Sequence, residues 1–244
     1  MLKKLKLKTK LISFDLWETL ITDRPHGKKM NLRSSKRTNI LYSYLNDKKP
    51  DLTLTHIKKS LVMLSQRCTQ DHNRGKDIKF NKRIKKLFEI LEIENNVNTV
   101  QEVGAILDDC FIKYPPQMFP KTLELLKSLS KEYKLCLTSN TGITSPETYY
   151  KYLEIIGIKK LFDKIYLSNE IEIAKPSINI FKLILKDFNL NPENIIHIGD
   201  NIFTDIFGAK KAGFSAIYVN KRKSVDNELA FNPDYTVADI SELL

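Results

Sequence analysis

The sequence predicts an α/β protein in which a mostly parallel sheet carries helices on both faces and a helical segment is inserted after the first strand. Three observations predict this class. Short apolar runs that end in polar side chains occur at residues 9–16, 134–140 and 194–201, as expected for buried parallel strands. After Pro120, helical patterns alternate with such runs, which is typical of βαβ units. Between Met30 and Lys113 only helical patterns occur.

The first predicted strand ends at Asp15 and is followed by a turn that holds Trp17, the one tryptophan of the chain. The inserted segment comes next. Its helical patterns are ILYSYL, IKKSLVML, RIKKLFEIL and VGAILDDCFI, and polar breaks separate them. Pro115, Pro116 and Pro120 close the segment and indicate a linker back to the sheet.

The second half of the chain supplies the remaining elements in alternating order. Helices are predicted at 120–133, 145–158, 176–190 and 204–214, and strands at 134–140, 162–170, 194–201 and 215–220. Pro146 lies in the first turn of its helix, and Gly213 closes the last one. The strands run parallel if each helix crosses back over the sheet.

The composition indicates a globular protein that is neither a membrane protein nor a disulfide-stabilised one. Of the 244 residues, 42% are hydrophobic and 28% are charged. No apolar run approaches the roughly 20 residues of a membrane span, and the apolar stretch after the first lysines is too short for a signal peptide. The three cysteines have no metal-site or disulfide spacing, so we expect a cytoplasmic protein.

The net charge of +11 is concentrated in one segment. Residues 24–95 contain 18 Lys and Arg against 7 Asp and Glu, and the rest of the chain is neutral. A solvated helical surface explains this excess, and so does attraction of an anion. Nucleic acid is possible as the anion but is not favoured, because aromatic residues are not interleaved with the basic runs.

Polar side chains collect where the predicted strands end. Asp15, Ser139 and Asp200 each lie at the carboxyl end of a strand, and these ends meet at one edge of a parallel sheet. Asp205 begins the next helix and can point to the same place, and Lys175 is a candidate compensating cation. Converging carboxylates repel one another. A divalent cation with oxygen ligands, Mg²⁺ being the usual one, removes that repulsion.

Four segments resemble, in order, the four motifs of the haloacid dehalogenase superfamily of hydrolases. They are LISFDLWETLI, LCLTSN, KPSINIF and IIHIGDNIFTDIFGAKKAGF. The resemblance covers roughly residues 9–220, and its fourth motif is the most specific. It implies catalytic roles for Asp15, Thr19, Ser139 and Lys175, substrate contacts from Trp17, Ser139, Asn140 and Lys175, and metal ligands from Asp15, Asp200, Asp205 and the Trp17 backbone carbonyl.

The resemblance also implies a domain organisation. Residues 1–23 and 114–244 would form a Rossmann-like catalytic core, and residues 24–113 would form a helical cap of the C1 type. The expected reaction is Mg²⁺-dependent hydrolysis of a small anionic phosphorylated molecule. Asp15 would be the nucleophile and would form an aspartyl phosphate. The substrate and the oligomeric state are left open.

Trp17 departs from the phosphatase pattern. In phosphatases of this superfamily the residue two after the nucleophile is a second Asp, which protonates the leaving group. An indole N–H donates a hydrogen bond but does not shuttle a proton. Glu18 and His26 are candidate replacement acids, although Glu18 is more typical of a turn residue. His197 is expected to pack under a helix, and His56 and His72 to lie on helix surfaces.

Two alternatives stay open. Dehalogenases of the superfamily also have an aromatic residue at this position and work without metal, so a metal-independent 2-haloacid dehalogenase-like hydrolase is one. The retained acids Asp200 and Asp205 favour the phosphatase over it. The other alternative is a catalytically weakened protein whose basic cap binds a polyanion. Whether the anion is a small substrate or a polyanion, we expect the basic cap residues to attract it; these are Lys82, Arg83, Lys85 and Lys86.

Overall fold

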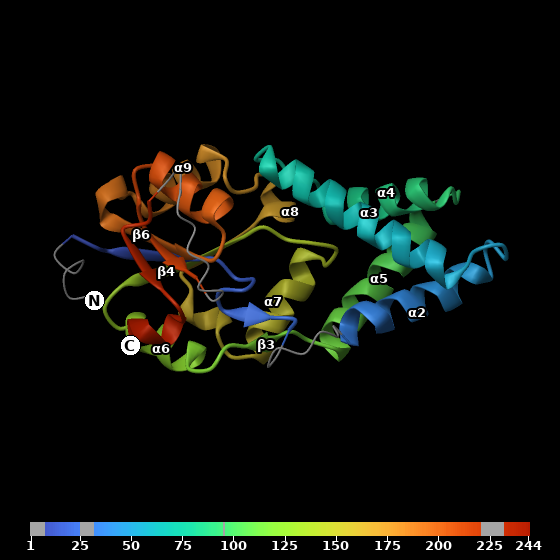
Figure 1. Cartoon of the computed structure of the whole chain (residues 1–244), viewed down its shortest axis with the longest axis horizontal. Coiled ribbons are helices and arrows are strands. Elements are labelled where there is room, and N and C mark those ends of the chain that lie inside the picture. The colour runs from blue at the N-terminus through green and yellow to red at the C-terminus, as the bar shows by residue number, and fades with distance from the viewer. Residues whose placement is uncertain (1–7, 25–31, 95, 221–231) are drawn as a thin grey trace.

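The structure is a computed structural model that describes residues 8–24, 32–94, 96–220 and 232–244. A sheet-based core and a bundle of helices lie next to each other along the long axis of the molecule (Figure 1). The described chain begins and ends in the core. None of the described helices provides the apolar length that a membrane crossing needs.

Six parallel strands form the main sheet in the order β5-β4-β1-β6-β7-β8. Their bounds are β1 Leu11–Phe14, β4 Lys134–Ser139, β5 Lys164–Leu167, β6 Ile195–Gly199, β7 Ser215–Val219 and β8 Tyr235–Val237. β1 lies between β4 and β6, and Phe14 is opposite Leu137 on one side and Ile198 on the other. The predicted parallel α/β sheet is confirmed.

Alternating side chains of the strands face two different layers of helices. Ile12 and Phe14 join a buried cluster with the helices α6, α7 and η5, whereas Leu11 joins one with α9 and α10, as the two-residue period of a strand requires. The bounds of the core helices are α6 Thr122–Leu129, α7 Pro146–Ile155, η2 Lys159–Leu161, α8 Ser168–Ile171, α9 Ile178–Phe188, η3 Pro192–Asn194, η4 Ile202–Phe207, α10 Gly208–Lys211 and η5 Ile240–Leu243.

Two predicted elements of the core differ from the structure. The strand expected at 162–170 ends at Leu167, because the chain turns into α8 at the sheet edge. The helix expected at 204–214 consists of a π-helical stretch, η4, that continues into the short α10. In η4 the backbone N–H groups of Asp205 and Ile206 both donate to the carbonyl of Asn201, which widens the first turn.

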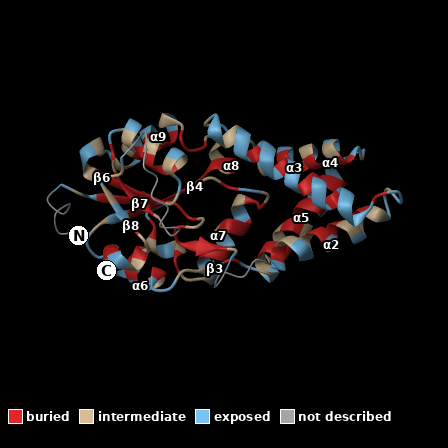
Figure 2. Ribbon diagram, in the orientation of Figure 1, coloured by how far each residue is buried: buried red, intermediate tan, exposed pale blue. Residues whose placement is uncertain are grey.

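Four helices among the described residues between β1 and α6 form the bundle. Their bounds are α2 Leu32–Asn46, α3 Leu54–Asn73, α4 Phe80–Leu91 and α5 Val97–Lys113. Thr53 and Asn96 cap α3 and α5 with reciprocal side-chain and backbone hydrogen bonds. The bundle has a hydrophobic cluster of its own, which includes Leu41, Ile84, Phe88 and Val103, and its buried residues face its interior (Figure 2).

A small second sheet joins the bundle to the core. β2 Ile21–Thr22 lies where the chain leaves the core, and β3 Gln117–Met118 lies where it returns. They pair in antiparallel fashion, with Ile21 opposite Met118. This pairing holds together the two segments that connect the bundle to the core. The sequence pattern did not predict it, because two residues are too few to show a period.

Candidate active site

The carboxyl ends of the three central strands bring together side chains from distant parts of the chain. Asp15 follows β1, Ser139 is the last residue of β4, and Asp200 follows β6. The backbone N–H of Asp15 donates to the carbonyl of Ile198 at 2.8 Å, so the end of β1 is fixed to β6. The sheet therefore places these side chains at one edge, as the strand pattern predicted.

Asp15, Asp200 and Asp205 form a carboxylate cluster. One oxygen from each lies within 4.8 Å of the others, and Asp15 and Asp205 are buried. Gly199 makes this approach possible, because a Cβ atom there would lie 2.3 Å from the Asp205 Cγ. The backbone N–H of Asn201 donates to Asp205 Oδ2 at 3.0 Å, which fixes the direction of that carboxylate.

Lys175 lies between two of these carboxylates. Its Nζ is 2.6 Å from Asp15 Oδ1 and 2.6 Å from Asp205 Oδ1, and the side chain is 1% exposed. Burial favours the neutral amine, but the two carboxylates outweigh it and raise the pKa of Lys175 above its ordinary value. Burial raises the pKa of Asp15 to about 6 although Lys175 opposes the rise. The pKa of Asp205 lies below its ordinary value, because Lys175 and His197 overcome its burial.

Asn140 holds the segment that carries Lys175. Its Nδ2 donates to the Lys175 carbonyl at 2.8 Å, and its Oδ1 accepts from the Lys175 backbone N–H at 2.9 Å. Both ends of the amide are therefore occupied by protein backbone. The geometry is that of a positioning residue for Lys175, whereas the family resemblance implies a substrate contact for Asn140.

His197 is buried and contacts the carboxylate cluster through Asp205. Its ring packs edge-on against Phe181 of α9, with 5.5 Å between ring centroids, so the predicted packing under a helix is confirmed. Its ring also makes polar contacts that the sequence did not predict: Nε2 lies 3.1 Å from Asp205 Oδ1, and Nδ1 lies 2.9 Å from Ser13 Oγ. Burial lowers the pKa of His197, so we expect a neutral ring that donates to Asp205. The alternation of side chains along β6 could have predicted this burial, because it places residue 197 on the sheet face that α9 covers.

The two hydroxyl residues of the site are also buried. Ser139 donates to the carbonyl of Asn140 at 3.3 Å, and both Ser139 and Thr19 are fully shielded from solvent. Thr19 Oγ1 has no hydrogen-bond partner among the described residues. Thr19 lies in the turn after β1, and Ser139 is the last residue of β4, at the strand end where the sequence predicted it.

Trp17 lies at the boundary between the core and the bundle. Its indole N–H donates to the Tyr149 hydroxyl at 3.2 Å, and its ring meets Phe111 of α5 edge-on. Neighbouring Glu18 has a positive φ of 54° and accepts a hydrogen bond from the Thr22 hydroxyl at 2.9 Å, which is the geometry of a turn residue. The other candidate acid, His26, lies outside the described residues.

A cavity of about 350 Å³ lies between the sheet edge and the bundle. Trp17 and Asn140 contribute to its core side, and Arg33 and Arg37 of α2 to its bundle side. Asp15 does not line it. None of the three clustered carboxylates lines the cavity. The cavity is connected to the site through Trp17 and Asn140, which are close in sequence to Asp15 and Ser139.

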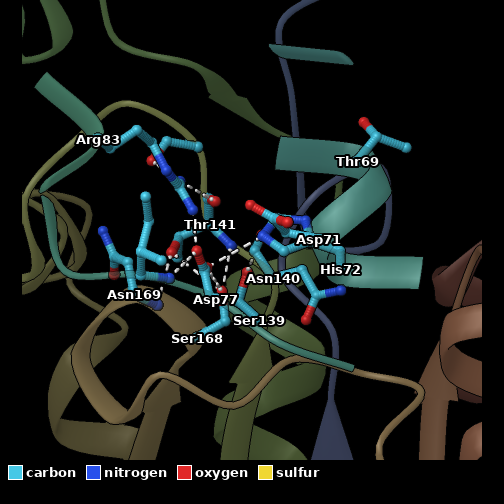
Figure 3. A network of polar contacts seen from close by, with 12 residues as sticks. Thr69, Asp71, His72, Asp77, Arg83, Ser139, Asn140, Thr141, Ser168 and Asn169 are labelled. Atoms are coloured by element: carbon cyan, nitrogen blue, oxygen red, sulfur yellow. Dashed lines mark hydrogen bonds and ion pairs between the residues drawn. The ribbon is translucent and has the colours of Figure 1, made fainter. Parts of the chain in front are cut away.

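Figure 3 shows a second polar network, where the turn between α3 and α4 meets the core. Asp77 accepts hydrogen bonds from the Arg83 guanidinium and, at 2.6 Å, from the Ser168 hydroxyl. Arg83 also donates to the carbonyls of Thr141, at 2.7 Å, and Gly142. The network fixes the bundle to the chain that directly follows Ser139 and Asn140.

Two expectations about this region are wrong. Arg83 is 1% exposed and is not a surface cation, because Asp77 and the carbonyls of Thr141 and Gly142 surround it. His72 is half-buried, and its Nε2 lies 3.0 Å from Asp77 Oδ2. Burial and the charge of Arg83 lower the pKa of His72 to about 4. His56 is exposed at the start of α3, as predicted.

The carboxylate cluster fits a hard divalent cation such as Mg²⁺. All three donors are oxygens, the ligand type that Mg²⁺ prefers. One oxygen from each carboxylate lies within 4.8 Å of the others, so a single cation can contact all three.

Comparison with known proteins identifies the family. The family model described as "Haloacid dehalogenase-like hydrolase" matches residues 44–219, which is more than half of the chain. The protein therefore belongs to the haloacid dehalogenase-like hydrolases. The family model matches the segments that carry Ser139, Lys175, Asp200 and Asp205, and the resemblance seen in the sequence is confirmed at this level.

Three individual proteins illustrate the similarity. The chain is 40% identical over 103 residues to "Glyceraldehyde 3-phosphate phosphatase" of Methanothermobacter thermautotrophicus, a match that covers 42% of this chain and 44% of that protein. A 2-haloacid dehalogenase from Pseudomonas syringae has the same fold, with a TM-score of 0.70, 20% identity and 96% of each chain covered. A HAD-hydrolase from Bacillus subtilis, bound to magnesium, has a TM-score of 0.66, 20% identity and 97% of each chain covered.

Proposed function

We propose that this protein is a Mg²⁺-dependent phosphatase that acts on a small anionic phosphorylated molecule through an aspartyl phosphate at Asp15. The observation that carries the proposal is the buried Asp15, whose Oδ1 lies 2.6 Å from the Lys175 ammonium within a cluster of three carboxylates. The phosphatase named among the relatives supports it, although the chain spans less than half the length of that protein.

The proposed roles follow from position. The ionised Asp15 attacks phosphorus, an aspartyl phosphate forms, and the leaving oxygen departs with the bonding electron pair. Lys175 and the Ser139 hydroxyl donate to the phosphoryl oxygens, and Thr19 completes the turn beneath them. Water then attacks the aspartyl phosphate and releases phosphate, which restores the Asp15 carboxylate.

Asp15, Asp200, Asp205 and the backbone carbonyl of Trp17 would hold the metal ion. Asp205 already accepts hydrogen bonds from Lys175, His197 and Asn201, so we assign it mainly to orienting Lys175. When bound, Mg²⁺ would neutralise charge on the transferred phosphoryl group.

The domain organisation belongs to the same proposal. Residues 1–23 and 114–244 form the catalytic core, and residues 24–113 form a helical cap of the C1 type. The separate hydrophobic cluster of α2–α5 and the β2–β3 pairing at the crossings support this division. The three cysteines are buried and free, which fits a reducing cytoplasmic location.

One observation favours a second candidate, a metal-independent dehalogenase. Trp17 supplies no acid, and its indole N–H is already bound to Tyr149. A halide leaves without a proton, so such chemistry needs no acid at this position. The carboxylate cluster argues against it, because like charges kept together without a cation are costly.

The test is a screen of phosphorylated metabolites with and without Mg²⁺, run beside Asp15→Asn. We expect phosphate release that requires Mg²⁺ and Asp15. Chloride release from 2-chloropropionate without metal, in the absence of phosphate release from any ester, would instead establish the dehalogenase.

A further inference from the structure

Two arginines that line the cavity between the cap and the core have buried N–H groups without hydrogen-bond partners among the described residues. Arg33 is 8% exposed, and its Nη1 has no hydrogen-bond partner among the described residues. The Nε of Arg37 is likewise buried and without a partner. Buried donors without partners are uncommon in native proteins and call for an explanation. Both residues line the cavity.

The two arginines are placed to act together. They are four residues apart on α2, so they share one face of the helix. Burial and the adjacent charge of Arg33 lower the pKa of Arg37 to about 10. Two like charges side by side destabilise each other, and the carboxylate of Asp23, which pairs with Arg33, offsets only one of them.

Rigid neighbours hold Arg33 in place. Its other terminal nitrogen, Nη2, forms an ion pair with Asp23. The guanidinium carbon lies 4.6 Å from the ring centroid of Phe111 and 5.3 Å from that of Trp17, within the range of a cation–π contact. Trp17 therefore forms part of a platform for a cation, which gives the tryptophan a role where phosphatases have an acid.

The charge of the cavity indicates a monoanion. Among its described lining residues, Arg33 and Arg37 are cationic, Asp23 is anionic, and His72 is neutral above its lowered pKa of about 4. One positive charge is left over. A carboxylate, with one negative charge, balances this excess positive charge. A phosphate dianion in the cavity, in addition to the phosphate transferred at Asp15, would bring one negative charge too many.

The size and the walls indicate a short molecule. The volume of about 350 Å³ lies at the lower end of small-molecule sites. Leu61 and Leu107 add apolar wall, and Thr141 and Thr144 also line the cavity. Trp17 and Asn140, which line the cavity, lie two residues after Asp15 and one after Ser139, so the cavity is on the side of the core that carries the predicted catalytic residues.

We infer that this cavity binds a carboxylate at the far end of the substrate, through Arg33 Nη1 and Arg37 Nε, and so selects short phosphorylated carboxylic acids. The inference rests on the proposed phosphatase function and adds a substrate class to it. It also moves anion recognition from the exposed lysines of α4 to the buried face of α2.

Binding is measured first, because it does not depend on turnover. The Asp15→Asn protein is titrated calorimetrically with phosphoglycolate and with ethyl phosphate, which lacks the carboxylate. We expect phosphoglycolate to bind about 10- to 100-fold more tightly, the range for a hydrogen bond to a charged group. Adding Arg37→Leu should remove most of that difference, and Arg33→Lys should reduce it while keeping the charge. Lys36→Leu, an exposed neighbour on α2, is the matched control for lost charge.

Turnover is measured second, as the ratio of kcat/KM for the two esters. We expect Arg37→Leu to lower kcat/KM at least about tenfold more for phosphoglycolate than for ethyl phosphate. Equal affinity for the two compounds in the Asp15→Asn protein, or an equal loss for both in Arg37→Leu, overturns the inference. Selective binding without hydrolysis of any ester, p-nitrophenyl phosphate included, supports the carboxylate site and overturns only the phosphatase.

Discussion

The two sides of the cavity differ in how their charges are partnered. On the core side, Lys175 lies between Asp15 and Asp205, and Asp205 also binds His197. On the cap side, Arg33 and Arg37 each keep a buried N–H group without a partner. The buried cation of the core side therefore uses its charge on carboxylates of the chain itself, whereas the two arginines of the cap side keep N–H groups that an anion can accept from. We infer that the first performs the chemistry and the second selects the substrate.

Removing the Asp200 carboxylate should have the largest effect on the core side. Asp200→Ala should lower phosphate release by at least about 10³-fold and remove its dependence on Mg²⁺, because a charged ligand of the metal is lost. Calorimetric titration with Mg²⁺ checks the binding directly. Glu193→Ala, at an exposed carboxylate in η3 at the other end of β6, is the control. Equal Mg²⁺ affinity in both variants would contradict the metal assignment.

Trp17→Asp tests whether this residue belongs to the chemistry or to selection. The new carboxylate should protonate poor leaving groups and speed the hydrolysis of alkyl phosphates by up to about 10²-fold, the lower end of general acid catalysis. It should also weaken carboxylate selection, since Arg33 loses one of its two aromatic contacts. The measurement is kcat/KM for phosphate esters that span leaving-group pKa. A flat profile in the unmutated protein would show that another residue already supplies the proton.

Arg83, which is buried, and Arg37, which is partly buried, are two arginines of the bundle with different polar partners. Arg83→Met removes the ion-pair partner of Asp77 and should lower the free energy of unfolding by about 3–5 kcal/mol. Arg37→Leu removes a cation with an unpaired donor, so its change should lie within about 1 kcal/mol of zero. Urea unfolding without ligand measures both. A loss of equal size in Arg37→Leu would mean that Arg37 is structural.

The pH dependence of stability should report the burial of His72. Its folded pKa of about 4 lies below the ordinary value of 6.5, so protonation favours the unfolded chain. Above pH 6.5 the ring is neutral in both states and the free energy of unfolding has its full value. As the pH falls from 6.5 toward 4, the free energy of unfolding decreases by roughly 3 kcal/mol in total. Relative to His72→Gln, the wild type should therefore lose unfolding free energy across that window. Parallel curves for the two proteins would show that His72 is accessible to solvent.

The same contrast explains what the sequence could predict. Asp15, Ser139 and Asp200 were predictable because each ends an apolar run, and parallel strands end at one edge. Arg33 and Arg37 were not, because the segment from 24 to 95 holds 18 basic residues, and helix rotation decides which of them are buried. Arg83 was misjudged for the same reason. Its burial depends on Asp77 in the preceding turn and on two carbonyls from a distant loop.

Direct detection of the covalent intermediate tests the central proposal. Wild-type protein is mixed with Mg²⁺ and phosphoglycolate, quenched rapidly in acid, and examined by intact mass and peptide mapping. We predict one phosphoryl group per chain, attached to Asp15, formed in a burst because Trp17 cannot activate the hydrolytic water, and absent from Asp15→Asn. Phosphate release by the wild type without any such adduct, and equally fast in Asp15→Asn, would contradict the mechanism.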